Sequence, residues 1–169
     1  MDVATIVEVV SQLTDVLVHY HRAGFVYRDL RPAQITFRTT NPIDVVLMQS
    51  DISTSAREFD SINSTLSGSP KYLPPEYLLL NAVSESGDWW SLGVTVLELA
   101  SGEHPFEGLD HSDITHHFVA GRPLEVTIVS PPRLQNLCRG LLIRDPALRW
   151  DGGEVIRWLA GEDPAIGPW

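Results

Sequence analysis

The chain has 169 residues with 22 acidic and 12 basic side chains, a formal net charge of -10 at pH 7, and 43% hydrophobic residues. These values indicate one globular domain and argue against nucleic acid or an anionic membrane as a partner. A single cysteine, Cys138, excludes an internal disulfide; with no signal-like N-terminus and no run near about 20 apolar residues, we expect a soluble intracellular protein, nuclear or cytoplasmic, without a membrane span.

The predicted elements are mainly helical. Apolar residues at positions 3, 6, 10, 13, 17 and 20 predict a helix with one buried stripe that stops near Gly24. Short apolar runs at 34–37 and 45–48 predict a small β-hairpin, and the Ser/Thr-rich residues 51–69 predict a long loop. Further helices are predicted at 88–100, which is apolar nearly all round, and at 112–120, 133–144 and 154–160.

Five segments resemble protein kinase landmarks in the same order, which chance similarity rarely produces. Residues 25–37, Phe-Val-Tyr-Arg-Asp-Leu-Arg-Pro-Ala-Gln-Ile-Thr-Phe, resemble the catalytic loop. The other four resemble the strand before the magnesium-binding Asp-Phe-Gly, the end of the activation segment, the start of the central helix and the last landmark of the large lobe, at residues 43–53, 68–76, 86–93 and 141–149. The chain therefore resembles the large (C-terminal) lobe of a Ser/Thr protein kinase.

This resemblance implies a kinase-like lobe over residues 1–160, with a catalytic-loop region at 25–37 and an activation segment at 51–76, followed by a tail at 161–169. The fold class expected is mainly α within the α+β family: a helical bundle around a buried central helix, with a hairpin that carries the catalytic and metal-binding loops. The insertion at 41–44, Asn-Pro-Ile-Asp, is similar to the calcium/calmodulin-type kinases of filamentous fungi.

The resemblance also implies catalytic roles. Asp29 stands at the place of the catalytic base, Arg31 at that of a phosphate contact, and Gln34 and Asp51 at those of the magnesium ligands. Two departures make the metal site degenerate: Gln34 replaces an asparagine, and Ser53 replaces the glycine of Asp-Phe-Gly. Asp29 is then either a working base or a relic that still anchors its loop, and we favour the relic.

Regulatory and structural roles follow from the same resemblance. Arg28 stands where kinases pair an arginine with an activation-segment phosphate, for which Thr54, Thr65 and Ser69 are candidate acceptors; a flexible polar loop is the alternative. Three residues are expected to be structural: Glu76 and Arg149 as a buried ion pair, and Asp88 as an acceptor for the catalytic-loop backbone. His111, His116 and His117, with His19 and His21 elsewhere, suggest metal ligands, but no acidic or cysteine partner lies at zinc-like spacing, so surface or packing roles are favoured.

The donor half of a kinase has no counterpart in the sequence. Residues 1–26 contain neither a glycine-rich loop nor a lysine, and Lys71 is the only lysine of the chain. We therefore expect the N-terminal lobe to be absent and the isolated chain to be a pseudokinase that needs no cofactor and binds a protein or peptide, for which a partner kinase is one candidate. The alternatives are an active Ser/Thr kinase that uses ATP and magnesium, with its N-lobe missing from this chain or gene model, and a nonfunctional fragment.

Overall fold

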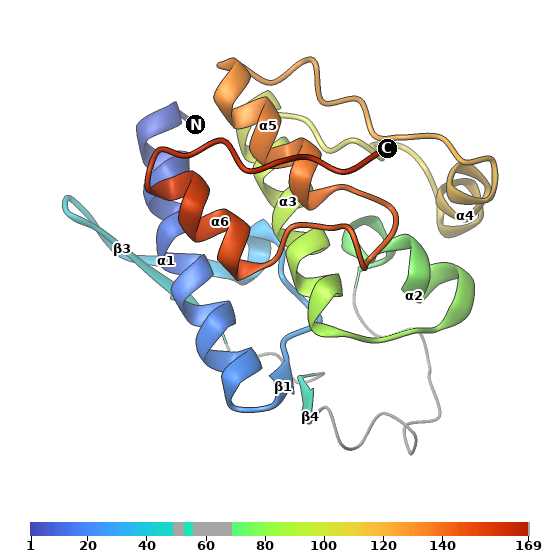
Figure 1. Ribbon diagram of the computed structural model, residues 1–169, viewed down its shortest axis with the longest axis horizontal. Helices are drawn as coiled ribbons and strands as arrows, with labels where there is room; N and C mark the ends of the chain where they lie inside the picture. The colour runs from blue at the N-terminus through green and yellow to red at the C-terminus, as the bar shows by residue number, and fades with distance from the viewer. Residues whose placement is uncertain (49–52, 56–68, 169) are drawn as a thin grey trace.

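The computed structural model describes residues 1–48, 53–55 and 69–168 (Figure 1). Helices dominate the described part of the chain, as the sequence predicts, and the strands form two small antiparallel sheets. The elements are, in chain order, α1 (Val3–Arg22), β1 (Phe25–Val26), η1 (Pro32–Gln34), β2 (Ile35–Thr40), β3 (Ile43–Leu47), β4 (Thr54–Ser55), η3 (Pro70–Tyr72), α2 (Pro75–Leu80), α3 (Glu85–Ser101), α4 (His111–Val119), α5 (Pro132–Leu141) and α6 (Gly152–Leu159).

Helix α3 is the centre of the fold. Its residues 88–97 are all buried, which explains why the sequence is apolar around the whole helix. Figure 1 shows α1 on one side of α3 and α2 and α4 on the other, with α5 packed along it. The predicted end is confirmed, because Gly102 follows the helix with a φ of +82° in the left-handed region that glycine adopts without strain.

Helix α1 starts and stops where its sequence predicts, with two more residues at its C-terminal end. Asp2 caps it by accepting a 3.0 Å hydrogen bond from the backbone N–H of Thr5, and Gly24 follows it with a φ of +79°. The predicted stripe faces the core and includes Ile6, Leu13 and Leu17.

The expectation that no segment resembles a membrane span needs a correction at α1. By length and composition alone this helix could cross a membrane, since an 18-residue window within it has a mean hydropathy of 1.2. Six of its residues are buried in the helical core, and a core helix passes the same test. It is the only such helix among the described residues.

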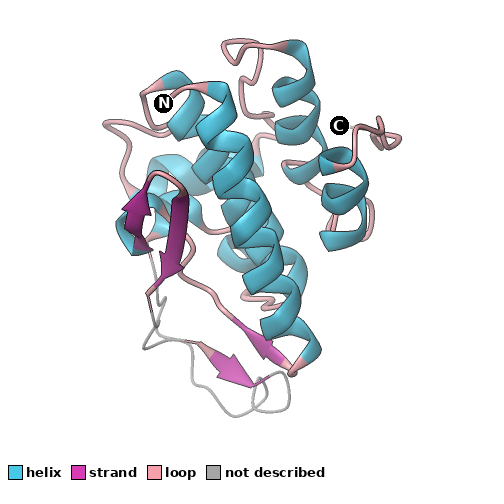
Figure 2. Cartoon of the chain, turned by 90° about the vertical axis from the view of Figure 1, so that its left-hand side faces the viewer, coloured by secondary structure: helices cyan, strands magenta, loops and turns pink. Residues whose placement is uncertain are grey.

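The predicted hairpin is formed by β2 and β3, with strands longer than expected. Ile35 pairs with Leu47, and the register shifts between Phe37 and Thr39. Gln12 of α1 holds the hairpin, because its amide donates to the Ile43 carbonyl at 2.9 Å and accepts from the Val45 N–H at 2.7 Å. Figure 2 shows the hairpin beside α1.

The predicted loop at 51–69 contains a short strand, so that prediction was wrong in part. Residues 54–55 form β4 and pair antiparallel with β1, which places Val26 opposite Thr54. Two alternating residues give no periodic signal, because the pairing depends on a partner strand about 30 residues earlier. Residues 56–68 lie outside the described part of the chain.

Helix α5 ends at Leu141, three residues before its predicted end at 144. Leu142 leaves helical geometry, with φ of -100° and ψ of 22°. In the turn that follows, the carbonyls of Ile143 and Arg144 accept hydrogen bonds from the buried guanidinium of Arg149. The predicted tail packs back onto the body, since the Trp150 Nε1–H donates to the Ala165 carbonyl at 2.9 Å.

Candidate functional site

Asp88, at the start of α3, fixes the backbone that leads to the catalytic loop. Its carboxylate is 1% exposed and accepts three hydrogen bonds of 2.8 Å each. Two come from the backbone N–H groups of Tyr27 and Arg28, and the third comes from Nε2 of His21. Since an ionised carboxylate only accepts, that ring nitrogen carries a proton. The predicted anchor therefore lies where its role requires.

The loop that Asp88 holds has an unusual backbone at Arg28, whose φ is +71°. A non-glycine residue rarely adopts this conformation, and it persists only where the surroundings over-determine it. The surroundings here include the Asp88 carboxylate and Tyr77, whose hydroxyl lies 3.1 Å from the Arg28 guanidinium. Tyr27 is tied down as well, because its hydroxyl donates to the Met48 carbonyl at 2.6 Å. Burial, with smaller effects from nearby carboxylates, raises the pKa of Tyr27.

Asp29 has both carboxylate oxygens bonded within its own loop. Its Oδ1 accepts from the Arg31 Nε at 3.0 Å, and its Oδ2 accepts from the Gln34 side-chain NH2 at 2.5 Å. Gln34 is positioned by η1, and its backbone carbonyl accepts from the Met48 N–H at 2.8 Å. The structure thus brings together three of the predicted site residues, with the Asp29 side chain only 11% exposed.

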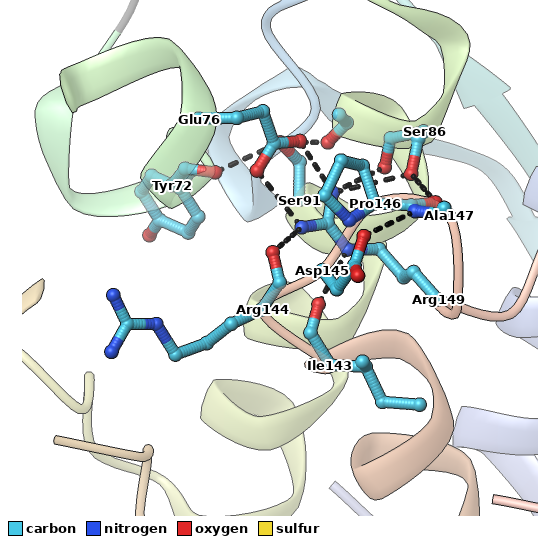
Figure 3. A network of polar contacts seen from close by, with 11 residues as sticks. Tyr72, Glu76, Ser86, Ser91, Ile143, Arg144, Asp145, Pro146, Ala147 and Arg149 are labelled. Atoms are coloured by element: carbon cyan, nitrogen blue, oxygen red, sulfur yellow. Dashed lines mark hydrogen bonds and ion pairs between the residues drawn. The ribbon is translucent and has the colours of Figure 1, made fainter. Parts of the chain in front are cut away.

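Glu76 and Arg149 form the predicted buried ion pair across 73 residues of sequence (Figure 3). The two guanidinium nitrogens Nη1 and Nη2 meet the two carboxylate oxygens at 2.6 and 2.9 Å. The remaining donors reach the carbonyls of Ser86, Ile143 and Arg144, and the guanidinium stacks 5.0 Å from the Trp90 ring. All five N–H groups of the arginine have acceptors, which a buried cation requires.

A second polar contact fixes the segment just before α2. The Ser91 hydroxyl of α3 lies 2.8 Å from the Tyr72 carbonyl, and the Tyr72 hydroxyl donates to Glu98 at 2.6 Å. Burial and the Glu98 hydrogen bond raise the pKa of Tyr72. The end of the predicted activation segment is therefore bonded to α3 through both the backbone carbonyl and the side-chain hydroxyl of Tyr72.

The predicted metal and regulatory residues are described only in part. Asp51 and Thr65 lie outside the described residues. Thr54 is the first residue of β4, and Ser69 directly precedes η3. Among the described residues, no group of three or more His, Cys, Asp and Glu side chains could hold a metal ion. Of the two predicted magnesium ligands, Gln34 lies in the described part of the chain, and its side-chain NH2 faces Asp29.

Three residues that take part in these polar contacts were not predicted from the sequence. His21 was weighed as a metal ligand and instead donates to Asp88; Tyr77 contacts Arg28; and Glu98 accepts from Tyr72. The only sequence signal for Glu98 is a charge inside an otherwise apolar helix, which requires a partner when it is buried. The partners of His21 and Tyr77 are 67 and 49 residues away, so no local pattern reports them.

The comparisons with known proteins agree with one another and with the kinase resemblance of the sequence. Residues 1–157 match the protein kinase domain family. The chain is 33% identical over 141 residues to mouse ribosomal protein S6 kinase alpha-6, and 32% over 145 residues to the putative ribosomal protein S6 kinase alpha-1 of Caenorhabditis elegans. It is 30% identical over 140 residues to the protein kinase C-like 2 of Schizosaccharomyces pombe.

These alignments cover 82%, 85% and 81% of this chain but only 18%, 18% and 13% of the respective relatives. The chain thus spans less than a fifth of the length of each of these three relatives.

Proposed function

Because the chain belongs to the protein kinase family, with relatives of the Ser/Thr type, we propose that these 169 residues form its large lobe and, taken by themselves, act as an interaction module rather than as an enzyme. The lobe comprises residues 1–160, and the tail at 161–169 follows it. The finer similarity to calcium/calmodulin-type fungal kinases stays a prediction.

The observation that carries this proposal is the state of Asp29. A catalytic base needs a carboxylate lone pair within hydrogen-bond reach of the acceptor hydroxyl. Here Arg31 and Gln34 each donate to one of the two Asp29 oxygens, and the backbone of Gln34 is held by the hydrogen bond from the Met48 N–H to its carbonyl. An acceptor hydroxyl would have to compete with these two donors for the carboxylate before it could lose its proton.

The charge available for a phosphate donor supports the same proposal. Phosphoryl transfer depends on positioned cations that neutralise the phosphates. The only lysine of the 169 residues, Lys71, lies at η3 and faces Glu107 at 3.5 Å. Arg31 is the cation nearest to Asp29 among the described ion pairs, and its Nε is used by that residue.

The partner surface that we propose is made of the end of the activation segment and α4. Helix α4 contacts both α2 and η3, so the end of the activation segment and α4 lie side by side. Both Tyr72 and Glu76 are fixed from beneath by α3 and by Arg149, which gives this face a rigid base. A rigid surface loses little entropy on binding a protein or peptide.

A second candidate function is phosphoryl transfer from ATP to protein hydroxyls, with the donor half supplied by a longer form of the chain. The intact anchoring of the Asp29 loop favours it, since Asp88 accepts hydrogen bonds from the backbone N–H groups of Tyr27 and Arg28. Asp29 would then act as the base and Arg31 as the phosphate contact, while Gln34 and Asp51 would hold magnesium, which neutralises phosphate charge when bound.

The test is nucleotide binding by the purified 169-residue chain. Calorimetry and thermal shift with ATP and magnesium are expected to show no saturable binding, and a peptide-array kinase assay is expected to show no phosphorylation. Asp29→Asn is the matched control, because it removes the base and keeps the size of the side chain. Saturable binding together with phosphorylation that Asp29→Asn abolishes would establish the enzyme and defeat the interaction-module proposal.

A further inference from the structure

Two histidines flank Phe106 in an aromatic cluster that joins η3 to α4. The ring centroids of His104 and His117 lie 6.0 and 5.3 Å from that of Phe106. Tyr72 of η3 meets His104 edge-on at 4.8 Å, and Phe118 of α4 meets Phe106 at 5.5 Å. The two imidazoles are therefore part of the packing that holds α4 in place.

The hydrogen bonding of His104 defines its protonation state. Its Nδ1 accepts the backbone N–H of Phe106 at 2.9 Å, so this nitrogen carries no proton and the ring is neutral. Its Nε2 is buried and has no hydrogen-bond partner among the described residues. Burial lowers the pKa of His104; Lys71 acts in the same direction, while Glu98 and Glu107 oppose it.

His117 is in a similar state on the other side of Phe106. Its Nε2 is also buried, and no partner for it exists in the described part of the chain. Burial lowers the pKa of His117, and the cations of Arg122 and Arg144 lower it further, against the backbone groups of Arg122 and Pro123. A proton added to either ring would place a charge among aromatic side chains, which is costly without a hydrogen-bonded counter-ion.

We propose that His104 and His117 form a pH-sensitive latch, which holds α4 against η3 and α2 while both imidazoles are neutral and releases it when they are protonated. The latch depends on the packing and protonation of these two rings and is independent of whether Asp29 is active. Its consequence for the proposed interaction surface is that the surface loses α4 in mildly acidic conditions.

The direction of the pH dependence follows from linkage. Both pKa values are lower in the packed state than the ordinary 6.5 that the open state restores, so the open state binds more protons between those values. The stabilisation that the neutral rings give to the packed state of α4 is fully present above pH 6.5 and is lost as the pH falls below it. His21 lies elsewhere, against the Asp88 carboxylate, and does not belong to the latch.

Hydrogen exchange followed by mass spectrometry tests the latch on the intact chain. Exchange rates, normalised for the intrinsic effect of pH, are compared between pH 7.5 and pH 5.5 for peptides from α4 and from α6. We expect the opening constant of α4 to rise by up to about tenfold per pH unit for each histidine. Peptides from α6 should change little.

Matched variants separate the latch from general acid instability. His104→Asn keeps an acceptor for the N–H two residues on, and His117→Phe keeps an aromatic ring, so the double variant retains the packing without titratable groups. It should abolish the pH response of α4. His116→Gln changes an exposed histidine of the same helix and should leave the response as it is.

Should the double variant fail to fold, the wild-type ring nitrogens still decide the matter by 15N NMR. The ring nitrogens of His104 and His117 are expected to titrate below pH 6.5, together with the rise in α4 exchange. The proposal is overturned if both latch histidines titrate near pH 6.5 without any change in α4 exchange, or if α4 and α6 open together.

Discussion

Two arginine–carboxylate pairs, one buried and one exposed, let the effect of burial be measured at the scale of single residues. The Arg149 side chain is 0% exposed in its pair with Glu76, whereas Arg157 and Glu162 are 55% and 52% exposed in theirs. We predict that Glu76→Gln lowers the free energy of unfolding by about 3–5 kcal/mol, because it leaves a buried cation without its counter-ion. Urea unfolding followed by tryptophan fluorescence measures the change.

The exposed pair supplies the control for this measurement. Glu162→Gln makes the same chemical change in water and should lower the free energy of unfolding by less than about 1 kcal/mol. Equal effects of the two substitutions would contradict the assignment of Glu76 as the structural counter-ion of Arg149.

Asp88 gives a second prediction at the residue scale. Asp88→Asn replaces one carboxylate oxygen by an NH2 group, which faces a donor from Tyr27, Arg28 or His21 and accepts nothing. The free energy of unfolding should fall by about 1–3 kcal/mol, since a buried donor is left unsatisfied. Hydrogen exchange should rise at residues 26–30 in particular. Asp44→Asn, at an exposed pair, is the control; a uniform rise across the chain would show that Asp88 has no local role.

At the scale of elements, helix packing depends on close approaches at glycine. A Cβ added at Gly140 of α5 would lie 2.1 Å from the Trp150 indole, and one added at Gly93 of α3 would lie 2.8 Å from the Leu141 Cβ. Alanine is favoured over glycine by about 1 kcal/mol inside a helix, yet overpacking commonly costs about 1–3 kcal/mol. Because the indole is rigid, overpacking wins at Gly140.

We therefore predict that Gly140→Ala lowers the thermal midpoint despite its better helix propensity. Gly153→Ala is the control, because the nearest atom there is the flexible Asp151 carboxylate at 3.1 Å. Differential scanning calorimetry of both variants measures the effect. A midpoint that is raised by Gly140→Ala would mean that α5 and Trp150 are not in contact in solution.

The elements also show which parts of the fold could be predicted from the sequence. Helices α1 and α3 have long periodic or wholly apolar stretches and glycines at their ends, so their type and C-terminal ends could be read from local sequence. The predicted start of α3 at 88 was three residues late, because the helix begins at Glu85. Short elements were missed: β4 depends on pairing with β1, and α2 spans only six residues at a run of prolines. The turn after α5, which presents the Ile143 and Arg144 carbonyls to Arg149, was also missed, because no local pattern indicates those acceptors.

The same distinction holds for the candidate site when the whole molecule is considered. Asp29, Asp88, Glu76 and Arg149 could be selected because each lies in a segment that resembles a known landmark. The sequence could not show that Gln34 turns its NH2 toward Asp29, since that depends on how η1 is joined to the end of β3. It also gave no sign of the His104 and His117 cluster, in which the interacting rings come from separate segments.

The single cysteine allows the stability of the whole molecule to be followed. Cys138 lies on α5 and is fully buried in the core, and burial raises the pKa of its thiol to about 12. Only the thiolate reacts, so labelling at pH 8 requires an opening that exposes α5. We predict that a disulfide reagent labels the folded chain at least about 10³-fold more slowly than the urea-unfolded chain.

Ser112→Cys provides the matched control, since Ser112 is exposed on α4. In that variant one thiol should react at nearly the unfolded rate and Cys138 at the slow rate. Because α3 and α5 pack against each other in the core, the slow labelling rate should follow the free energy of global unfolding. Glu76→Gln and Gly140→Ala should therefore raise this rate in proportion to their loss of stability. Rapid labelling of Cys138 in native buffer would show that α5 opens by itself, and a single cooperative lobe would then be the wrong description.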